Sequence, residues 1–387
     1  MSGQDILIAG GGLVGLASGL ALRRAGFAVC VLDQAAPPPA PETAVDDVRV
    51  YALSPASLRF LQTLGVVLPP EQCAAYHRMQ VWETVPKKAL TFHADVPGAA
   101  LGVMVEHRYL AHALMQAAQA ASLPVRWRTT ITTVQAGEGA VHLGISTAQV
   151  LDARLLVVCD GPRSTLRAQL GVPVVQRDYG QRAIIATVMP DRPHQGIAWQ
   201  RFLPSGPLAL LPRADGAFAL VWSCDAAFAD AVLALSAAAF QTMLNADTQE
   251  AAGVLRLCSP CKAIPLHLLH PQQIIGDGFV LAGDAAHVVH PLAGQGLNLG
   301  FADAEQLARV LDEAKAAGRG WWRARTLARY AGARKAEARE VMAITDGLQR
   351  LFGSSAAPLA VLRQHGLAAV QRLGPLKGWL TAQATRL

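Results

Sequence analysis

Residues 283–303 read GDAAHVVHPLAGQGLNLGFAD, and this stretch decides what fold we expect. It follows an apolar run at residues 279–282 (FVLA), which is typical of a buried strand. The sequence therefore predicts a strand, an acidic turn, a glycine-rich loop and then a helix that begins near Gly296. The loop is rich in backbone N–H groups, and the helix dipole adds partial positive charge at the same place. Such a loop suits a ligand with an electron-rich edge that the main chain approaches closely.

The amino-terminal residues 5–33 predict a strand, a helix and a second strand. Gly10, Gly12 and Gly15 form a G-x-G-x-x-G motif between the first strand and the helix, and Asp33 ends the second strand. In this context the glycines allow a tight turn and close approach to a pyrophosphate, while the acid binds a ribose hydroxyl. The segment therefore predicts dinucleotide binding.

The acid at the end of the second strand does not distinguish NAD from FAD. The remote glycine-rich loop does, because a simple nicotinamide site has no use for it. The pyrimidine edge of a flavin fits that loop, since reduction places negative charge on this edge. We therefore expect FAD.

A third segment, DGPRSTLR at residues 160–167, follows an apolar strand at residues 155–159. We expect Asp160 to cap the following helix and Arg167 to return to it. Taken alone, the segment also fits an ordinary strand–turn–helix.

Together the three segments resemble the FAD-dependent aromatic hydroxylases of the para-hydroxybenzoate hydroxylase fold. More narrowly, the chain is similar to the ubiquinone-biosynthesis hydroxylases, the UbiH/UbiF/UbiI group, from about residue 5 to about residue 352. The signature positions of that group are His290, Pro291, Gly294, Gln295, Gly296, Asn298, Gly300 and Asp303. Further matching segments are 49–65, 179–181, 201–212, 220–223 and 330–335. One departure is RLCSPCKAIP at residues 256–265, where the group usually has an apolar lead into Phe-Pro-Leu.

The motifs and the resemblance together name a set of cofactor-binding residues. By resemblance, Pro291 covers the flavin face and residues 294–298 offer N–H groups to its pyrimidine edge. Asp284 would contact the ribityl or pyrophosphate region, and Arg49 a phosphate or ribityl oxygen. The full set is Gly10, Gly12, Leu13, Val14, Gly15, Asp33, Arg49, Asp160, Gly283, Asp284, Pro291, Gly294, Gln295, Gly296, Leu297 and Asn298.

The resemblance also implies the chemistry. Reduced flavin binds O2 at carbon 4a, and the resulting C4a-hydroperoxide passes its distal oxygen to an aromatic ring. The flavin carries this chemistry, so we expect neither a separate catalytic set nor a metal. NAD(P)H would dock transiently as the reductant, because a second G-x-G-x-x-G motif is absent from the sequence. We expect His287 and His290 to brace the flavin loop.

The expected architecture is α/β. A Rossmann-like FAD-binding domain is interleaved with a mostly antiparallel β-sheet substrate domain, and C-terminal helices follow. The sheet is expected from short strands such as 183–188 and 218–222. The predicted FAD-binding domain comprises residues 1–78, 93–175 and 271–350, the substrate domain residues 79–92 and 176–270, and the helical tail residues 351–387.

Six residues of the predicted sheet are candidates for the substrate wall. Aromatic and apolar residues in such strands are also commonly core residues, so both readings stay open. The candidates are Tyr179, Trp199, Phe202, Leu210, Pro212 and Trp222.

Composition limits the class of protein. The 387 residues are 52% hydrophobic and 16% charged, which argues against disorder. The net charge of +6 is spread along the chain, so it fits an anionic membrane surface or acidic substrate better than nucleic acid. A spanning apolar run and a basic leader are not seen, so we expect a cytoplasmic protein, with peripheral contact on the inner face of the membrane as an option. Six scattered cysteines fit a reducing compartment, and Cys258 and Cys261 read as a surface turn.

The leading hypothesis is an FAD monooxygenase that hydroxylates a (poly)prenylated phenol in ubiquinone biosynthesis. The alternatives are an FAD hydroxylase of another phenolic compound, or a flavin-bound scaffold subunit of a quinone-biosynthesis complex. Expected partners are the hydrophobic phenol, a membrane surface or such a complex, and a second copy of the chain. Residues 361–387 alternate apolar and basic residues, which fits a membrane surface, packing on its own domain or a subunit contact.

Overall fold

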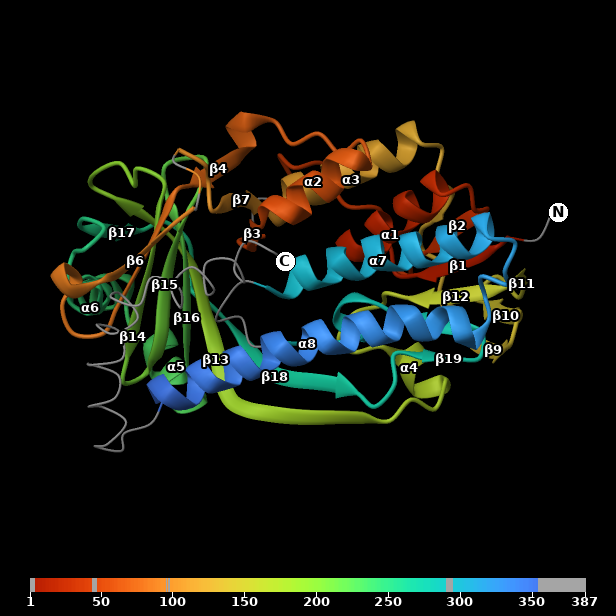
Figure 1. Cartoon of the computed structure of the whole chain (residues 1–387). Coiled ribbons are helices and arrows are strands. Elements are labelled where there is room, and N and C mark those ends of the chain that lie inside the picture. Colours follow the sequence, from red (N-terminus) through yellow and green to blue (C-terminus); the bar gives the residue numbers. More distant parts are fainter. Residues whose placement is uncertain (1–3, 44–46, 95, 97, 290–294, 354–387) are drawn as a thin grey trace.

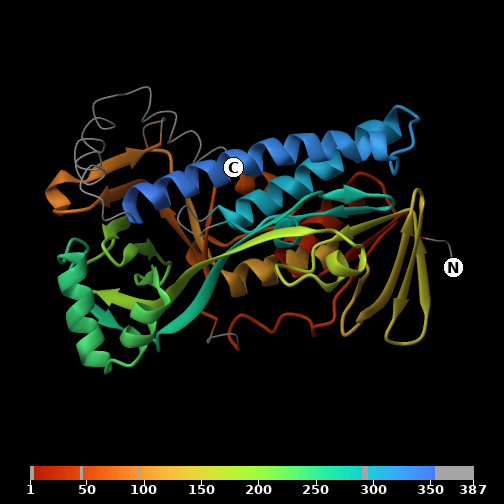
Figure 2. The same ribbon diagram turned by 90° about the horizontal axis from the view of Figure 1, so that it is seen from below.

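The computed structural model describes residues 4–43, 47–94, 96, 98–289 and 295–353 (Figure 1). A parallel sheet with its helices occupies one end of the molecule, and a large, mostly antiparallel sheet occupies the other (Figures 1 and 2). Within the described residues, the predicted α/β architecture with a Rossmann-like part is confirmed.

The parallel sheet has the strand order β19-β20-β12-β1-β2-β8. Its four inner strands are fully buried runs of apolar residues, as expected for a parallel sheet that is covered on both faces. Since β1, β12 and β20 run parallel, their carboxyl ends lie at one edge, where ligands bind in such folds. The strands are β1 (Ile6–Ala9), β2 (Val29–Leu32), β8 (Val125–Arg126), β12 (Leu155–Val158), β19 (Ile275–Gly276) and β20 (Phe279–Leu281).

Helices pack around this sheet and position its binding edge. Each of α1 and α7 follows the carboxyl end of a sheet strand, and the two helices pack against each other. α8 then packs on α7 (Figure 1). The helices here are α1 (Leu13–Arg24), α2 (Pro55–Thr63), α3 (His107–Ala120), α4 (Thr165–Gln169), α7 (Gly296–Ala316) and α8 (Ala324–Gly353), with the short 3-10 turn η3 (Gly283–Ala285). Two further 3-10 turns, η1 (Pro70–Gln72) and η2 (Pro86–Lys88), lie against strands of the other sheets.

The large sheet has the order β17-β13-β16-β15-β14-β5-β6, with β18 also paired to β13. Its pairs are antiparallel except β14 with β5, which is parallel. Two helices, α5 (Ala226–Leu233) and α6 (Ala237–Thr248), cover one face. The strands are β5 (Arg78–Trp82), β6 (Leu90–His93), β13 (Val174–Pro190), β14 (Ile197–Leu203), β15 (Gly206–Pro212), β16 (Phe218–Asp225), β17 (Leu255–Leu257) and β18 (Lys262–Pro271).

The strand β13 is 17 residues long, much longer than the predicted strand at 183–188. Its first half pairs with β18 as a two-stranded ribbon that runs between the two sheets (Figures 1 and 2). Most residues of this half are exposed, so the alternation of apolar and polar residues that reveals a strand is absent there. A register shift between Asp178 and Gln181 marks where the ribbon joins the sheet.

Two small sheets complete the described fold. The sheet β3-β7-β4 lies between the two large parts, where its Ala74 and Met104 pack with Ala198 of the large sheet. The sheet β11-β10-β9 lies at the far end of the parallel part (Figure 1). These strands are β3 (Val50–Leu53), β4 (Cys73–Tyr76), β7 (Gly102–Glu106), β9 (Ile131–Gly137), β10 (Ala140–Ile145) and β11 (Val150–Ala153). The chain thus crosses between the parts several times, and the predicted domain limits stay a prediction.

Candidate functional site

The two glycine-rich turns, almost 270 residues apart in the sequence, meet at the binding edge of the parallel sheet. A Cβ atom added to Gly300 would lie 2.5 Å from a methyl carbon of Val14, and one added to Gly283 would lie 3.1 Å from another. The first turn of α1 therefore packs directly on the turn before α7 and on α7 itself. The site combines the carboxyl ends of β1 and β20.

Each glycine of the G-x-G-x-x-G motif has its own structural reason. A Cβ on Gly10, whose φ is +105°, would overlap the carbonyl oxygen of Cys159, and one on Gly15 would overlap that of Gly10. These two glycines let the strand and helix approach closely. Gly12 caps α1, is exposed and has free space around it, so the helix N-terminus is open to an anion.

Asp33 lies beside this loop at the end of β2. Its carboxylate accepts hydrogen bonds from the backbone N–H of Gly11 at 2.5 Å and of Ala35 at 2.7 Å. These bonds fix the carboxylate next to the glycine loop, where an adenosine ribose would meet it. Its role toward the ribose stays a prediction.

The segment after β12 differs from the expectation. The cap of α4 is Ser164, whose hydroxyl accepts from the Arg167 N–H at 3.0 Å, whereas Asp160 only approaches the Leu166 N–H at 3.5 Å. Arg167 donates to the carbonyls of Ala285 and Pro162 instead of returning to Asp160. One buried carboxylate oxygen of Asp160 has no hydrogen-bond partner in the described part of the chain, and burial raises the pKa of this group. This carboxylate oxygen beside Gly10 could accept a hydrogen bond from a ligand hydroxyl group.

The turn at Gly283 has a positive φ of +61°, which favours glycine. Its N–H donates to Asp303 at 2.8 Å, and His287 Nε2 bonds the same carboxylate oxygen at 2.7 Å, so His287 braces the turn. The Asp284 side chain is exposed at this turn, and partial desolvation by the surrounding protein raises its pKa.

The helix α7 begins at Gly296, as predicted. Gly296 is half-buried and has free space where a side chain would be, so its backbone is accessible; Leu297 is half-buried as well. The Asn298 side chain accepts from the Ser54 N–H at 3.1 Å and the Ser57 hydroxyl at 2.8 Å, which ties the helix start to α2. Gln295 is buried at the helix cap. Three predicted loop residues, His290, Pro291 and Gly294, lie outside the described residues.

Arg49 does not point freely into the site. Its guanidinium forms two bonds with Asp47, at 2.8 and 2.6 Å, and remains half-exposed. Beside it, Tyr51 and His107 lie 3.3 Å apart across a hydrogen bond. Burial raises the pKa of Tyr51 to about 12, and burial followed by the nearby Arg49 lowers the pKa of His107 to about 4, so both are neutral near pH 7. The pair was not predicted from the sequence, because Tyr51 lies in the matching segment 49–65 but His107 lies in none of the matching segments.

The six substrate-wall candidates fall in different environments. Leu210 and Trp222 are fully buried in the cluster under α5 and α6, and Trp199 packs against the same cluster. Their positions match a core role, on the face that is turned away from α1 and α7 (Figure 1). Phe202, by strand alternation, lies on the opposite face with Ala198. Tyr179 is half-buried at the register shift of β13, and Pro212 is buried at the end of β15.

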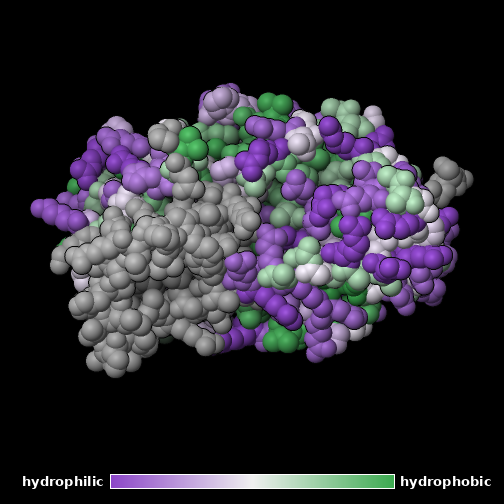
Figure 3. Space-filling model, in the orientation of Figure 1, coloured by the Kyte–Doolittle hydropathy of each residue, from purple (hydrophilic) through white to green (hydrophobic). Residues whose placement is uncertain are grey.

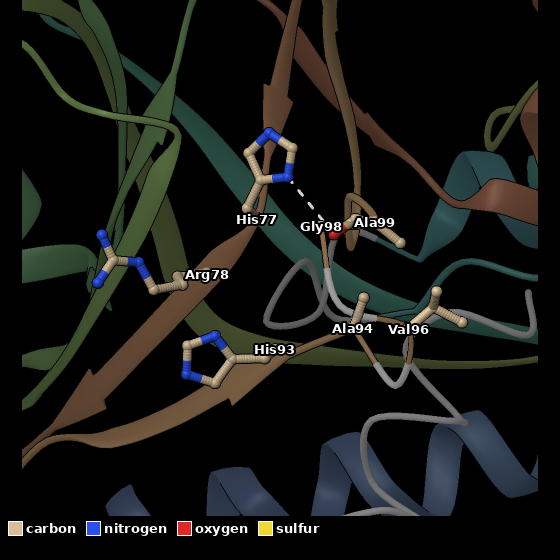
Figure 4. Close-up of a pocket in the computed structure, with 7 residues that line it drawn as sticks. All are labelled: His77, Arg78, His93, Ala94, Val96, Gly98 and Ala99. Carbon is tan, nitrogen blue, oxygen red and sulfur yellow. Dashed lines mark hydrogen bonds between the residues drawn. The ribbon is translucent and has the colours of Figure 1, made fainter.

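A separate cavity of about 450 Å³ lies at the edge of the large sheet (Figure 4). It is lined by His77, Arg78, His93 and four small residues of the following loop, none of them from the glycine turns. His77 bonds the carbonyl of Ala99 at 3.4 Å. Elsewhere among the described residues, no three His, Cys, Asp or Glu side chains gather as a metal site, and Cys258 and Cys261 are free thiols.

Comparisons with known proteins agree with this geometry. The FAD binding domain family (FAD_binding_3) matches residues 4–345. The chain is 33% identical to 3-demethoxyubiquinol 3-hydroxylase of Escherichia coli (strain K12), covering 96% of each chain. It is 36% identical to ubiquinone hydroxylase UbiL of Rhodospirillum rubrum, covering 96% of this chain and 87% of the relative. It is 30% identical to the human mitochondrial ubiquinone biosynthesis monooxygenase COQ6, covering 99% and 92%.

Solved structures show the same fold. The p-nitrophenol 4-monooxygenase PnpA from Pseudomonas putida DLL-E4 has a TM-score of 0.77 at 18% identity, covering 99% of this chain and 98% of that one. PqsL, a probable FAD-dependent monooxygenase from Pseudomonas aeruginosa, has a TM-score of 0.79 at 22% identity, covering 91% and 97%. The predicted resemblance is confirmed: the chain belongs to the FAD binding domain family and is an FAD-dependent monooxygenase.

Proposed function

We propose that this enzyme hydroxylates the aromatic ring of a (poly)prenylated phenol in ubiquinone biosynthesis. The observation that carries the proposal is similarity along nearly the whole chain to enzymes named for ubiquinone hydroxylation. NAD(P)H as a transient reductant and O2 as co-substrate are typical of the family. The two alternatives, a hydroxylase of another phenol and a scaffold with bound flavin, are separated by the experiments below.

We propose that the converging turns hold FAD along its length. The open N-terminus of α1 at Gly12 would take the pyrophosphate, and Asp33 the adenosine ribose. Asp160 and Asp284 would face hydroxyl groups between the two ends. The backbone N–H groups at Gly296 and beyond would face the flavin pyrimidine edge, where the helix dipole favours negative charge. The bound flavin supplies the electron transfer and oxygen activation; the chain binds, orients and shields it.

For the substrate wall, the sheet face opposite α5 and α6 is the better candidate. Ile185, Val221 and Ala209 are direct neighbours across three strands, and all three are half-buried. Leu211 on the same face packs against the cluster of Ala74 on β4, Met104 on β7 and Ala198 on β14, so this face is turned toward the FAD-binding part. A row of apolar side chains that solvent can still reach suits the prenyl chain or ring of a hydrophobic phenol. Phe202 shares this face and remains a candidate.

The enzyme would meet such a substrate at a membrane surface. Among the described residues, none of the helices combines the length and apolar character needed to cross a bilayer. Hydrophilic residues are dispersed over the visible FAD-binding part, with only small apolar areas between them (Figure 3). With its net charge of +6, the protein would be drawn to anionic lipid. Membership of a quinone-biosynthesis complex and pairing with a second copy remain part of the proposal.

The purified protein should bind FAD and couple NAD(P)H oxidation to ring hydroxylation. We expect a prenylated phenol to stimulate NAD(P)H consumption and to gain one oxygen atom, measured by mass spectrometry. Hydroxylation of simple phenols with none of the prenylated compound would favour the first alternative. Bound flavin with no hydroxylation of either class would favour the scaffold.

Gly12→Ala should weaken FAD binding without disturbing the fold. The added methyl group meets no protein atom but occupies the space beside the helix N-terminus. We expect the dissociation constant for FAD to rise by roughly tenfold, about 1.4 kcal/mol, with an unchanged melting temperature of the apoprotein. The matched control is Gly332→Ala on α8, which also has free space around it. Equal FAD affinity in the two variants would contradict the assignment.

Val221→Trp should impair use of the prenylated substrate while leaving FAD binding intact. The indole ring would fill the space beside Ile185 and Ala209, so we expect the KM for the prenylated phenol to rise by about tenfold. Steady-state kinetics and a parallel FAD titration measure the two effects. Val150→Trp, at an exposed position of β11, is the control. An unchanged kcat/KM in Val221→Trp would contradict the assignment of this face as the substrate wall.

Membrane contact predicts co-sedimentation with anionic phosphatidylglycerol vesicles that weakens as salt is raised, because the attraction is electrostatic. Equal partition with neutral phosphatidylcholine vesicles, or none with either, would contradict this part of the proposal.

A further inference from the structure

The helix α8 reaches the cofactor turn through two side chains one turn apart. Arg334, which is 3% exposed, donates from Nε to Asp303 at 2.5 Å and from Nη2 to the carbonyl of Leu299 at 3.2 Å. Tyr330 donates to the carbonyl of Leu281 at 2.9 Å. The helix is thus fastened both to the strand that precedes the turn and to α7, which follows it.

Asp303 is the centre of this arrangement. One of its oxygens binds Arg334, and the other accepts from the Gly283 N–H and from His287. The residue is fully buried, and a buried carboxylate is costly unless a cation compensates it. Two cations touch it. The guanidinium of Arg334 is charged at every working pH, whereas the imidazole of His287 is charged only when protonated.

We propose that Arg334 is a positioning residue for FAD: through Asp303 it keeps the Gly283 turn in its cofactor-binding shape regardless of pH. This inference rests on the proposed role of that turn in binding FAD. None of the motifs assigned Arg334 a function, although residues 330–335 match the family. Its effect on the cofactor is indirect, because it contacts the turn only through a buried carboxylate.

The charges around His287 determine what happens when Arg334 is lost. Burial alone would lower the pKa of His287, but the Asp303 carboxylate and its hydrogen bond outweigh burial and raise it. Burial would likewise raise the pKa of Asp303, but His287 and Arg334 outweigh it and lower it. The charged and titratable groups that face this pair are Asp284 on η3, Arg334 and Tyr330 on α8, His270 on β18 and Cys159 after β12. Beyond them, Glu337 pairs with Arg334, His267 faces Asp284, and Lys335 and Arg339 face His270.

Without the guanidinium, His287 is the one cation in contact with Asp303 among the described residues. Below its raised pKa the imidazolium still compensates the carboxylate, so the turn keeps its shape. As pH rises through that pKa the compensation is lost, and a buried carboxylate remains unpaired. FAD affinity should then fall with rising pH, which a loss of packing alone would not produce.

The experiment is a titration of apoprotein with FAD, followed by flavin fluorescence at about pH 6 and about pH 9. For Arg334→Met we expect the dissociation constant to rise by roughly tenfold more than in the parent between the two pH values. Arg334→Lys keeps a positive charge and should behave like the parent. The control is Arg329→Met, which removes an exposed arginine of α8 that is paired with Glu313 of α7.

Two further variants complete the test. In Arg334→Met/Asp303→Asn the buried charge is gone, so the pH dependence should disappear. His287→Gln alone should keep parent-like pH dependence, because Arg334 suffices; this variant decides the question if Arg334→Met does not fold. A pH-independent Arg334→Met, or a pH-dependent loss of FAD in His287→Gln, would overturn the proposal.

Gly283→Ala separates this inference from the site itself. The added methyl group would lie 3.1 Å from Val14, and the backbone conformation at this position is one that alanine rarely adopts. The substitution should therefore weaken FAD binding at both pH values. If Gly283→Ala binds FAD normally, the proposed site fails. If it binds FAD weakly while Arg334→Met shows no pH dependence, only the role of Arg334 fails.

Discussion

The contact of Val14 with Gly283 and Gly300 is the constraint on which the rest of the site depends. It packs the first turn of α1 against a turn formed almost 270 residues later, so two helix N-termini open at one edge of the sheet. Side chains at either glycine would push the helices apart. Three buried hydrogen-bonding residues stabilise the same geometry. Asp303 links α7 to the Gly283 turn, Asn298 links α7 to α2, and Tyr330 links α8 to β20.

The two faces of the large sheet have different surroundings. One of its faces is sealed by α5 and α6, and the other carries half-buried apolar residues toward the FAD-binding part. One face therefore forms the core of this part of the molecule, and the other is the face that we propose as the substrate wall. A phenol on that face would lie between a water-poor wall and the cofactor, where excluding water protects oxygen transfer from side reactions.

The features that sequence predicted are local ones. The βαβ unit, the start of α7 at Gly296 and the strands of the large sheet follow from patterns within a few residues. Contacts between elements that are far apart in the sequence were not predictable. Alternation assigns Trp222 and Leu210 to one face, but the partner that covers this face, α5 with α6, is known only from the fold. The pairing of Arg334 with Asp303 and the exposed ribbon of β13 and β18 likewise depend on contacts or exposure that no motif encodes. The cap of α4 is different: Ser164 lies within the segment 160–167, but the expected cap was Asp160.

The most direct test of the account is amide hydrogen exchange of the apoprotein with and without FAD. If one cofactor bridges both turns, amide exchange should slow in residues 10–15 and in residues 283–298. Half-maximal protection of the two segments should occur at the same FAD concentration. Protection confined to one of these segments, or appearing in the two at different FAD concentrations, would contradict a single shared site.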